Sequence, residues 1–579
     1  MLTPITSPRK WRDFNVYDFE WVPNTLEIRL CGVFDGRKYR AYRSVKHFIS
    51  EELTHSNRGK WFYAHAGGLA DFQFVLDALN SIGGYEVRAC FSNSSAIIVH
   101  VSRGKNSWHF VDSYWLLRDK LENIGKWIGL EKGEKEKRLT PEDAKEFYRS
   151  APLAELLEYN RLDCEILWKA ICELQYVLWE LGGQLQMTLA SSAMNMFRRK
   201  FLKRDIETDW GVNTTAEKAY CASRVEVFQH ETWDANYLDI NSSFPYAMTK
   251  PCPGEFLGST RHIPDHGIYI AHCKISIPDM PIPPTPLKLE GRIFFPVGEW
   301  KGWFSSVDVE LLQTVGGKIL EVYEVLNFAP FDDLSEYATT FYEKRRAAQS
   351  PFEKMAYKLF LNSLYGKFAE KETKCSLRLN PKQIQRETWE MLFPGAWLVE
   401  TAIPIPHRHV PISVHITAIA RRTLYQFLTE CHEVHYCDTD GFSTEDYFPT
   451  GDGLGELKWE KRWDHIRYVV PKGYAGTGNE LDKQGSWIPL DEKQSVKMKG
   501  FSNMTMAKFE TLLEGGTIEF ERMRRIKELA RKGGFKPREE TISKTLRRKT
   551  IGKRFAYPDG HTRAWGTCEL KQYWEQGKL

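Results

Sequence analysis

Asp438 and Asp440 flank a single threonine directly after a strand-like segment, Glu433 to Tyr436. Side chains two residues apart on an extended chain project to the same side, so the two carboxylates form a pincer suited to a divalent cation. Gly441 follows, where a tight hairpin could turn. An Asp-Thr-Asp tripeptide alone is more often a solvated turn. Its function therefore depends on which distant segments the fold brings beside it.

Two other segments carry complementary chemistry. Asp239 ends an apolar strand-like run and precedes a polar turn. Lys358, Asn362 and Tyr365 fall at helical spacings of four and three, so they share one helix face. A nucleotide needs cations for its triphosphate, an aromatic ring against its base or sugar, and paired acids for the magnesium that bridges the phosphates. The three segments together predict a nucleotide site.

The segments Asp239 to Pro245, Lys358 to Gly366 and Tyr436 to Asp440 resemble, in this order, motifs A, B and C of the family B DNA polymerases. The resemblance implies that Asp239 and Asp440 hold two Mg²⁺ (or Mn²⁺) ions with Asp438 beside them. It also implies that Phe244 stands where the family usually has the tyrosine that blocks a ribose 2′-hydroxyl. The residues it places against the incoming dNTP are Ser243, Phe244, Arg346, Lys354, Lys358, Asn362 and Tyr365. For Lys354 and the cluster Lys344 to Arg346, a solvated helix face is the alternative.

A second group of acids lies near the N-terminus. Asp18 and Glu20 lie two residues apart on a strand-like run. A second run resembles a buried strand and ends before His65, and Asp71 follows it. Tyr159 and Asp163 share a face of a segment with helical periodicity. This set resembles the three motifs of the family's proofreading 3′-5′ exonuclease. The resemblance implies that Tyr159 and the four acids are catalytic and that the acids bind two metal ions.

The sequence departs from the family's exonuclease motifs at several positions. Ala66 stands where the family has an asparagine that touches single-stranded DNA, so we expect hydrolysis to survive with weaker strand binding. Tyr114 replaces the leucine of a Ser-Leu strand-binding element that begins at Ser113. Lys132 lies where an exonuclease lysine is expected, although a solvated loop is at least as good an interpretation. The Tyr-x-Gly-Gly linker appears as Tyr220 to Ser223 without either glycine, which puts in doubt how synthesis is balanced against editing.

The length of the chain and the spacers between its motifs indicate which branch of the polymerase family it resembles. The chain has 579 residues and resembles the compact protein-primed branch of bacteriophages and linear plasmids. Its spacers at 261–334 and 371–409 match the positions of that branch's two terminal-protein regions. The resemblance implies a DNA-directed DNA polymerase that replicates a viral or plasmid linear genome with strand displacement, primed from a hydroxyl on a terminal protein. Extension of an ordinary nucleic-acid primer is the nearest alternative; a nuclease with a decayed polymerase half and a non-catalytic DNA-binding scaffold are more distant ones.

Smaller elements agree with this branch. The run Thr417 to Arg421 resembles its primer-template element, and Lys472 with Tyr474 resembles its Lys-x-Tyr element, which steadies the primer end. The residues expected to contact DNA are His65, Ser113, Tyr220, Gly366, Thr417, Arg421, Lys472 and Tyr474.

The basic charge is concentrated near the C-terminus. Residues 522–554 hold 14 lysines and arginines against 3 glutamates, a local charge of +11 in a chain whose net charge is +4. Phe535 and Phe555 are interleaved with this charge. Because phosphate contacts dominate affinity for DNA, a duplex-gripping surface is a better interpretation than a solvated basic helix.

Eleven cysteines are present without a CxxC pair. The segment Cys431 to Cys437 looks metal-binding by composition, but strand alternation would send His432 and His435 to opposite faces, so a zinc cage is not expected there. Scattered thiols, the absence of an apolar run long enough for a membrane and the absence of a signal-peptide core predict an intracellular protein of the host cytoplasm.

The expected fold is α/β and multidomain, with an α+β palm. A ribonuclease-H-like exonuclease would span 1–195 and a right-hand polymerase 196–579. Within the latter we expect a palm at 196–260 and 410–470, a first insert at about 261–334, fingers at 335–370, a second insert at about 371–409 and a thumb at 471–579. The protein would act as a monomer or as a heterodimer with the terminal protein.

Overall fold

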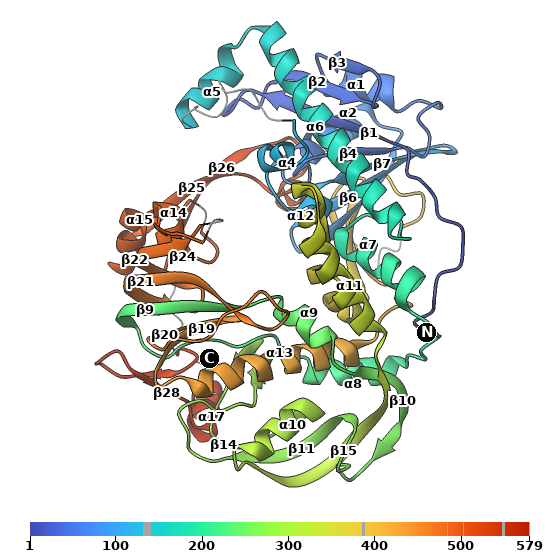
Figure 1. The fold of residues 1–579 in the computed structure, drawn as a ribbon. Coiled ribbons are helices and arrows are strands. Elements are labelled where there is room, and N and C mark those ends of the chain that lie inside the picture. The colour runs from blue at the N-terminus through green and yellow to red at the C-terminus, as the bar shows by residue number, and fades with distance from the viewer. Residues whose placement is uncertain (131–140, 385–387, 483–484, 502, 547–550, 578–579) are drawn as a thin grey trace.

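The computed structural model describes residues 1–130, 141–384, 388–482, 485–501, 503–546 and 551–577. In Figure 1 the N-terminal elements lie at the top, the strands around β9 (Glu231–Ile240) at the left, and a third sheet at the bottom. The helices α11 (Asp333–Ala347) and α12 (Pro351–Ser363) stand between them. The mixed α/β, multidomain fold predicted from the sequence is confirmed.

The N-terminal sheet is built around β1 (Phe14–Trp21), which pairs in parallel with β4 (Trp61–Ala64) and antiparallel with β2 (Ile28–Phe34). Alternation along β1 divides its side chains between two cores. Phe14 and Val16 pack on the side of α6 (Leu153–Glu180), whereas Tyr17 and Phe19 pack with α1 (Val45–Glu52) and α2 (Asp71–Ile82). Asp18 and Glu20 share the parity of Val16, so they face α6.

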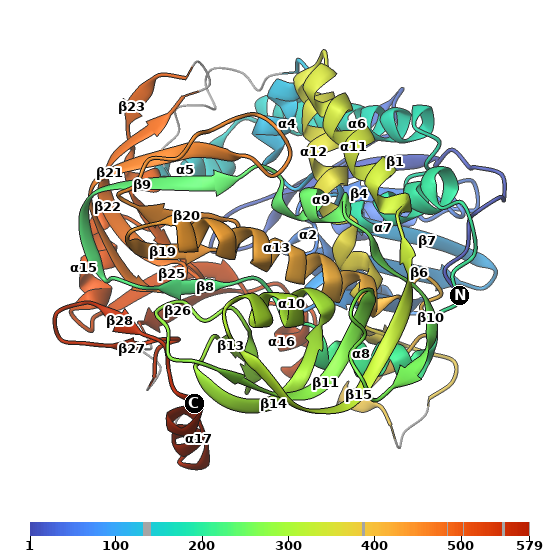
Figure 2. The ribbon, with the colours of Figure 1, turned by 60° about the horizontal axis from the view of Figure 1, so that its bottom comes forward.

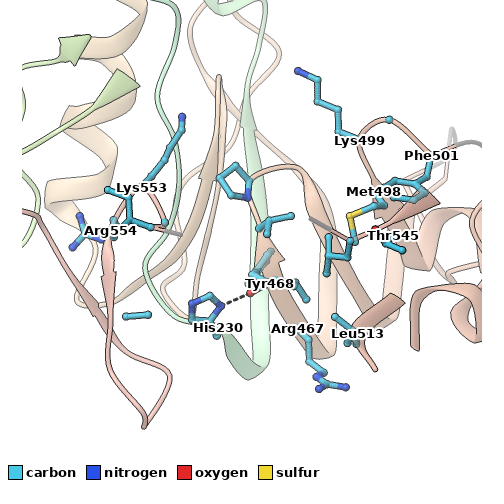
Figure 3. Close-up of a pocket in the computed structure, with 18 of the residues that line it drawn as sticks. His230, Arg467, Tyr468, Met498, Lys499, Phe501, Leu513, Thr545, Lys553 and Arg554 are labelled. Carbon is cyan, nitrogen blue, oxygen red and sulfur yellow. Dashed lines mark hydrogen bonds between the residues drawn. The ribbon is translucent and has the colours of Figure 1, made fainter. Parts of the chain in front are cut away.

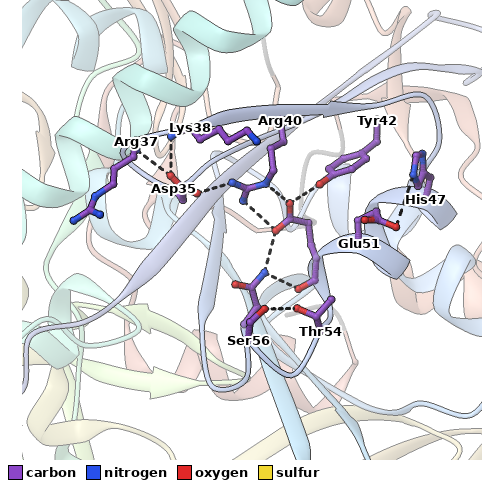
Figure 4. Close-up of polar contacts among 11 residues, drawn as sticks. Asp35, Arg37, Lys38, Arg40, Tyr42, His47, Glu51, Thr54 and Ser56 are labelled. Atoms are coloured by element: carbon purple, nitrogen blue, oxygen red, sulfur yellow. Dashed lines mark hydrogen bonds and ion pairs between the residues drawn. The ribbon is translucent and has the colours of Figure 1, made fainter.

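A buried carboxylate fastens α1 to the edge of this sheet. Glu52, the last residue of α1, accepts hydrogen bonds from Arg40 Nε and from the Tyr42 hydroxyl, both at 2.7 Å (Figure 4). Arg40 and Tyr42 lie on β3 (Tyr39–Tyr42). Because Glu52 is 1% exposed, these donors offset the loss of its hydration.

The second insert joins the N-terminal sheet. β16 (Thr373–Leu379) pairs antiparallel with β5 (Glu86–Ser92), and two more strands, β18 (Ala396–Ala402) and β17 (Glu390–Phe393), follow outward. Among the described residues the sheet reaches ten strands in the order β17-β18-β16-β5-β6-β7-β4-β1-β2-β3. Strands of the insert at 371–409 therefore belong to the same sheet as strands of the first 195 residues. The length of the spacer alone does not predict this pairing.

The second large sheet carries the acids of the opening motif. β9 lies between β20 (Gly441–Thr444) and β21 (Leu457–Val470). The sheet continues through β22 (Gly473–Leu481), which also pairs with β24 (Val496–Met498). Strands beyond residue 470, where we expected the thumb to begin, therefore belong to the same sheet as Asp239.

The helix α13 (Val410–Glu430) supports this sheet. Its residues are apolar on every side, and it is buried between the β9 sheet and α10 (Ser306–Thr314), as Figure 2 shows. A helix that is hydrophobic all round belongs in an interior. The four-stranded sheet below α10 has the order β10-β15-β11-β14 and is formed by β10 (Cys252–Thr260), β15 (Lys318–Phe331), β11 (Ile268–Ile277) and β14 (Gly298–Ser305).

The helices α11 and α12 form an antiparallel pair with clear local causes. Ser350 and Glu353 make a capping box and Pro351 occupies the first turn, so α12 begins there. Phe360 of α12 packs on Phe341 of α11.

The C-terminal segment returns to the lower sheet. Trp565 and Leu570 pack with Phe294, and Gly566 pairs with Val297. The remaining elements are β6 (Ser95–Arg103), β7 (Asn106–Asp112), α3 (Tyr114–Leu117), α4 (Leu121–Trp127), α5 (Pro141–Ser150), α7 (Leu189–Met196), η2 (Phe197–Phe201), α8 (Trp210–Ala219), β8 (Val225–Val227), α9 (Ser243–Met248), β12 (Leu287–Leu289), β13 (Arg292–Phe294), η3 (Tyr365–Ala369), β19 (Val434–Asp438), β23 (Trp487–Pro489), α14 (Glu492–Ser495), α15 (Met506–Leu513), β25 (Thr517–Met523), α16 (Ile526–Arg531), β26 (Glu539–Thr545), β27 (Phe555–Ala556), β28 (Thr562–Arg563) and α17 (Thr567–Glu575). None of the helices in the described ranges is both long and apolar enough to cross a membrane.

Two candidate active sites

Three carboxylates from distant segments meet at one end of the β9 sheet. Gly441 pairs with Asp239 on one side of β20 and with Asp438 on the other. Asp440 completes the turn between β19 and β20, and its carbonyl accepts a hydrogen bond from the Ile240 N–H at 2.8 Å. The structure thus brings together the acids that the sequence separates by about two hundred residues.

The charge balance of this acid cluster suits a divalent cation. Burial, followed by the charges of Asp239 and Asp438, raises the pKa of Asp440 to about 7. Burial, followed by the charge of Glu460, raises the pKa of Asp239 to about 6. Carboxylates that repel one another in this way are stabilised by a cation between them, so Asp239, Asp438 and Asp440 fit the metal-binding role.

Two lysines reach the cluster. Lys458 Nζ lies 2.9 Å from Asp239 Oδ2 and 3.2 Å from Glu460 Oε1. The Lys472 ammonium contacts Asp438 Oδ1, so this residue, expected to contact DNA, touches an acid of the cluster instead. Lys458 and Glu460 were not expected at this site from the sequence. The signal that could have found them is the pairing of β21 with β9, which sets Lys458 opposite Asp239.

The face predicted for the nucleotide lies beside these acids. The rings of Phe244 and Tyr365 stack with centroids 4.3 Å apart. Partial burial, followed by the neighbouring charges of Arg345 and Lys458, lowers the pKa of Lys358. The negative charge of Asp239 raises it by a smaller amount, which shows that the ammonium lies near this acid. Arg345 Nη1 lies 3.5 Å from Ser242 Oγ. The interpretation of Arg345 as part of a solvated face is therefore wrong.

Other predicted nucleotide residues lie apart from these contacts. Arg346, Lys354 and Asn362 have exposed side chains on the helix pair and its end. Ser243 is 2% exposed, and its hydroxyl has no hydrogen-bond partner among the described residues. Their roles toward a nucleotide stay predictions.

Arg421 and Thr417 are not presented to DNA. Arg421 is 4% exposed, and its Nη2 lies 2.8 and 3.1 Å from the two carboxylate oxygens of Asp308. Its Nη1 donates to the Cys221 carbonyl at 2.8 Å, within the linker that lacks the family's glycines. The Thr417 hydroxyl donates to carbonyls of its own helix. The prediction of direct DNA contact is wrong for both in this structure, because both side chains are buried on the packed faces of α13.

The other residues expected to contact DNA near this site differ in their exposure to solvent. Tyr474 is 6% exposed and packs against Tyr436 and Tyr468, so its ring is part of a core. Tyr220 is half-buried and Gly366 is exposed.

The second acid group also converges. Asp18 and Glu20 face α6, which carries Tyr159 and Asp163, and Asp71 begins α2. Burial, followed by the charge of Asp18, raises the pKa of Asp71 well above its ordinary value. Asp71 Oδ1 is buried without a hydrogen-bond partner among the described residues, as expected of an oxygen that would face a metal ion. Asp112, a neighbouring acid, has its pKa raised to about 6 by burial.

Asn160 is a residue of this site that the sequence analysis missed. Its amide Nδ2 lies 3.0 Å from Asp18 Oδ2 and 3.1 Å from Glu20 Oε1. Its Oδ1 accepts a hydrogen bond from the Tyr39 hydroxyl at 2.8 Å. A Cβ at Gly32 would lie 1.6 Å from Asn160 Oδ1, so glycine is needed there for the amide to fit. Asn160 follows Tyr159 directly, and only the packing of α6 on β1 reveals its role.

Ser113 holds His65 and does not reach the surface. The Ser113 side chain is fully buried, its hydroxyl donates to the Ala64 carbonyl at 3.1 Å, and His65 Nδ1 lies 3.0 Å from it. Direct contact of Ser113 with a DNA strand, as predicted, is excluded by this burial. The neighbouring Tyr114 is exposed and its ring lies beside that of His65. Lys132 lies outside the described residues.

The basic C-terminal segment is only partly a surface. Phe535 is 1% exposed and packs on Phe393 of the N-terminal sheet, and Arg554 is buried beside Glu226. The interpretation of Phe535 as a ring interleaved with surface charge is wrong. A cavity of about 1390 Å³ nevertheless opens in this region (Figure 3). The basic residues that line it are Arg292, Arg467, Lys499, Lys544, Lys553 and Arg554.

Comparisons with known proteins show similarity to DNA polymerases. Residues 145–380 match the family model described as DNA polymerase type B, organellar and viral. A probable DNA polymerase of Neurospora intermedia is 26% identical over 394 residues, which cover 60% of this chain and 39% of that protein. The chain spans less than half the length of this and two other fungal relatives. The DNA-directed DNA polymerase of Enterobacteria phage PRD1 is 25% identical, and the match covers 79% of this chain and 82% of that protein.

The fold matches a solved polymerase over nearly its whole length. Phi29 DNA polymerase, in a complex with primer-template DNA and incoming nucleotide substrates, superposes with a TM-score of 0.71 at 18% identity, covering 93% of this chain and 100% of that one. At this identity the likeness concerns the fold. In sequence the chain is therefore similar to the organellar and viral type B DNA polymerases, and in fold to phi29 DNA polymerase, in line with the motifs around Asp239, Lys358 and Asp440.

Proposed function

We propose that the chain is a DNA-directed DNA polymerase that transfers nucleotides from dNTPs to a primer 3′-hydroxyl. The convergence of Asp239, Asp438 and Asp440 carries this proposal, because it places paired acids beside the Phe244 and Tyr365 rings and the Lys358 ammonium. Acids, cations and an aromatic wall at one place are what phosphoryl transfer from a nucleotide requires.

The residues of this site have distinct proposed roles. Asp239 and Asp440, with Asp438 beside them, would hold Mg²⁺ or Mn²⁺. When bound, the ions supply a lowered pKa for the attacking hydroxyl and charge compensation for the leaving pyrophosphate. Lys358 and Arg345 bind the triphosphate by charge, and the Phe244 ring excludes a ribose 2′-hydroxyl by bulk.

The second site supports a proofreading 3′-5′ exonuclease. Asp18, Glu20, Asp71 and Asp163 would hold its metal ions, Tyr159 lies on the same helix face as Asp163, and Asn160 orients the Asp18 and Glu20 carboxylates. His65 and the exposed Tyr114 beside it would receive the strand end. Removal of mispaired 3′ ends is the function this arrangement suits.

Substitutions in the two acid clusters separate the two activities. Asp440→Ala is expected to reduce incorporation of labelled nucleotide into primer-template DNA to background, while 3′-end degradation of single strands continues. Asp18→Ala with Asp71→Ala is expected to do the reverse. Asp464→Ala and Asp13→Ala, which remove exposed acids away from both clusters, are the matched controls. Unchanged incorporation by the Asp440 variant would overturn the polymerase assignment.

The basic cavity of Figure 3 is a candidate path for duplex DNA. Its lysines and arginines come from the β9 sheet, β13, the hairpin of β25 and β26, and the C-terminal segment, so phosphates could be contacted from several sides. Lys499→Ala with Lys544→Ala should weaken binding of primer-template DNA and reduce its salt dependence, without changing single-turnover incorporation once DNA is saturating. A salt dependence equal to that of the wild type would exclude this path.

Initiation from a terminal protein, followed by strand displacement, is the mode of replication that the inserts favour. The test is incubation of the purified chain with labelled dNTP, Mg²⁺ or Mn²⁺ and candidate proteins encoded beside its gene. A nucleotide covalently attached to one of these proteins supports protein priming. Extension of an ordinary primer, with no nucleotide on any protein, favours the alternative of a nucleic-acid-primed polymerase.

A further inference from the structure

Three potential metal ligands gather at the far end of the β19–β20 hairpin. Glu433 immediately precedes β19, His435 lies on it, and Glu445 immediately follows β20. One ligand atom from each lies within 4.8 Å of the other two. The pairing of Val434 with Thr444 brings the two glutamates to the same end of the hairpin.

His435 is the member of this group that points to a ligand. Its side chain is 0% exposed, and neither ring nitrogen has a hydrogen-bond partner among the described residues. Its Nε2 lies 3.9 Å from Glu445 Oε1, which is toward the acids but too far for a hydrogen bond. A buried imidazole with both nitrogens unpaired is costly, and a metal ion bound at one nitrogen would offset that cost.

The backbone around the three side chains is already fixed. The Thr444 hydroxyl donates to the Glu433 carbonyl at 2.7 Å, and the His435 carbonyl accepts from the N–H groups of Phe228 and Gln229 at 2.8 and 3.0 Å. Neither glutamate forms an ion pair with a lysine or arginine in the described part of the chain. Both glutamates have exposed side chains and can therefore adjust their rotamers to a ligand.

We propose that Glu433, His435 and Glu445 form a binding site for a transition-metal ion of the Zn²⁺ type, separate from the polymerase and exonuclease acids. One imidazole nitrogen and two carboxylate oxygens are a donor set that zinc accepts, with a fourth position left for water. The ion would join β19 to β20 and so stiffen the hairpin that carries Asp438 and Asp440 at its other end.

The site differs from the Cys/His cage that the composition of 431–437 suggests. His432 Nδ1 lies 2.7 Å from Asp446 Oδ1, and its side chain is exposed, so it takes no part. The Cys437 thiol is buried in the core beneath the sheet. His432 is exposed whereas His435 is buried, and the ligands that join His435 come from flanking glutamates.

The test is zinc binding to the full chain in excess Mg²⁺, which competes with zinc for the acid clusters proposed as the two active sites. Equilibrium dialysis with elemental analysis should give one zinc ion per chain, and zinc should raise the Tm. Glu433→Gln with Glu445→Gln should lower zinc affinity by about tenfold or more and abolish the Tm shift. Co²⁺ in place of Zn²⁺ should give a visible absorption band that the same variant loses.

Two control variants make the outcome decisive. Glu430→Gln removes an exposed acid at the end of α13, and Asp440→Asn removes an acid of the polymerase cluster; both should keep the zinc ion. The proposal is overturned if no zinc binds, if the double glutamine variant binds zinc as the wild type does, or if zinc is lost with Asp440→Asn.

Discussion

The rings of Phe244 and Tyr365 stack face to face, with their centroids 4.3 Å apart and their planes inclined by 12°. Phe244 lies on α9, just beyond Asp239, and Tyr365 begins η3 directly after α12. The stack therefore joins the segment after β9 to the helix that carries Lys358. A ring held in this way forms a rigid wall beside the acid cluster.

The first prediction concerns sugar selection by this wall. Phe244→Val removes bulk beside the sugar, so incorporation of ribonucleotides relative to deoxyribonucleotides should rise by about tenfold or more. Phe244→Tyr keeps the bulk and should retain discrimination. The measurement is kcat/KM for each nucleotide on one primer-template. Equal discrimination by the Val variant and the wild type would exclude Phe244 as the selecting residue.

The second prediction concerns Asn160. Asn160→Ala removes the amide that donates to Asp18 and Glu20, so exonuclease activity should fall by about 10- to 100-fold while polymerisation is unchanged. Because the carboxylates lose their orientation, the Mn²⁺ concentration for half-maximal exonuclease activity should rise. Tyr39→Phe removes only the hydrogen bond behind the amide and should have a smaller effect. A parallel loss of both activities would indicate a folding defect and contradict a positioning role.

The acid clusters could be predicted from the sequence because their local patterns are strong. Asp438 and Asp440 share a strand side, and their order after Asp239 and Lys358 matches a family whose fold brings the three segments together. Lys458, by contrast, reaches Asp239 only through the register of β21 on β9, which depends on tertiary pairing. Asn160 acts through the packing of α6 on β1, and no local pattern marks it.

The errors have a common physical cause. Arg421 and Ser113 belong to motifs that suggested DNA contact, but both side chains are buried, and their polar groups hold other parts of the protein instead. Exposure is a property of the packed fold, so a motif alone could not decide it. The second insert likewise could be placed by its position in the chain, whereas its pairing of β16 with β5 could not.

The third prediction concerns the buried ion pair of Arg421 and Asp308. Arg421→Ala leaves Asp308 charged and unpaired in the interior, so the free energy of unfolding should fall by about 3–5 kcal/mol. Arg422→Ala, at the neighbouring and more exposed position, breaks only a surface pair with Glu310 and should cost less than about 1 kcal/mol. Urea unfolding measures both. Because Arg421 also holds the Cys221 carbonyl, its variant should shift the ratio of exonuclease to polymerase activity. Equal stability losses in the two variants would show that the buried ion pair contributes no more to the free energy of unfolding than the surface pair.

The fourth prediction concerns the pH dependence of the acid cluster when chelator removes divalent ions. The pKa of Asp440 is raised from 3.8 to about 7, mainly by burial and then by Asp239 and Asp438. Between these values the folded chain binds more protons than the unfolded chain, so this group's contribution to stability is greatest at low pH and is lost as the pH rises through 7. Asp440→Asn removes the repulsion, so at pH 8 the variant should be more stable than the wild type by roughly 1–3 kcal/mol, and the difference should shrink as the pH falls and vanish below about pH 4, where the carboxyl is protonated in both states. Thermal unfolding in EDTA at both pH values measures this, with Asp464→Asn as the exposed-acid control. A difference that is independent of pH would show that the charge of Asp440 is already compensated in the folded chain, so the three acids would not require a cation between them.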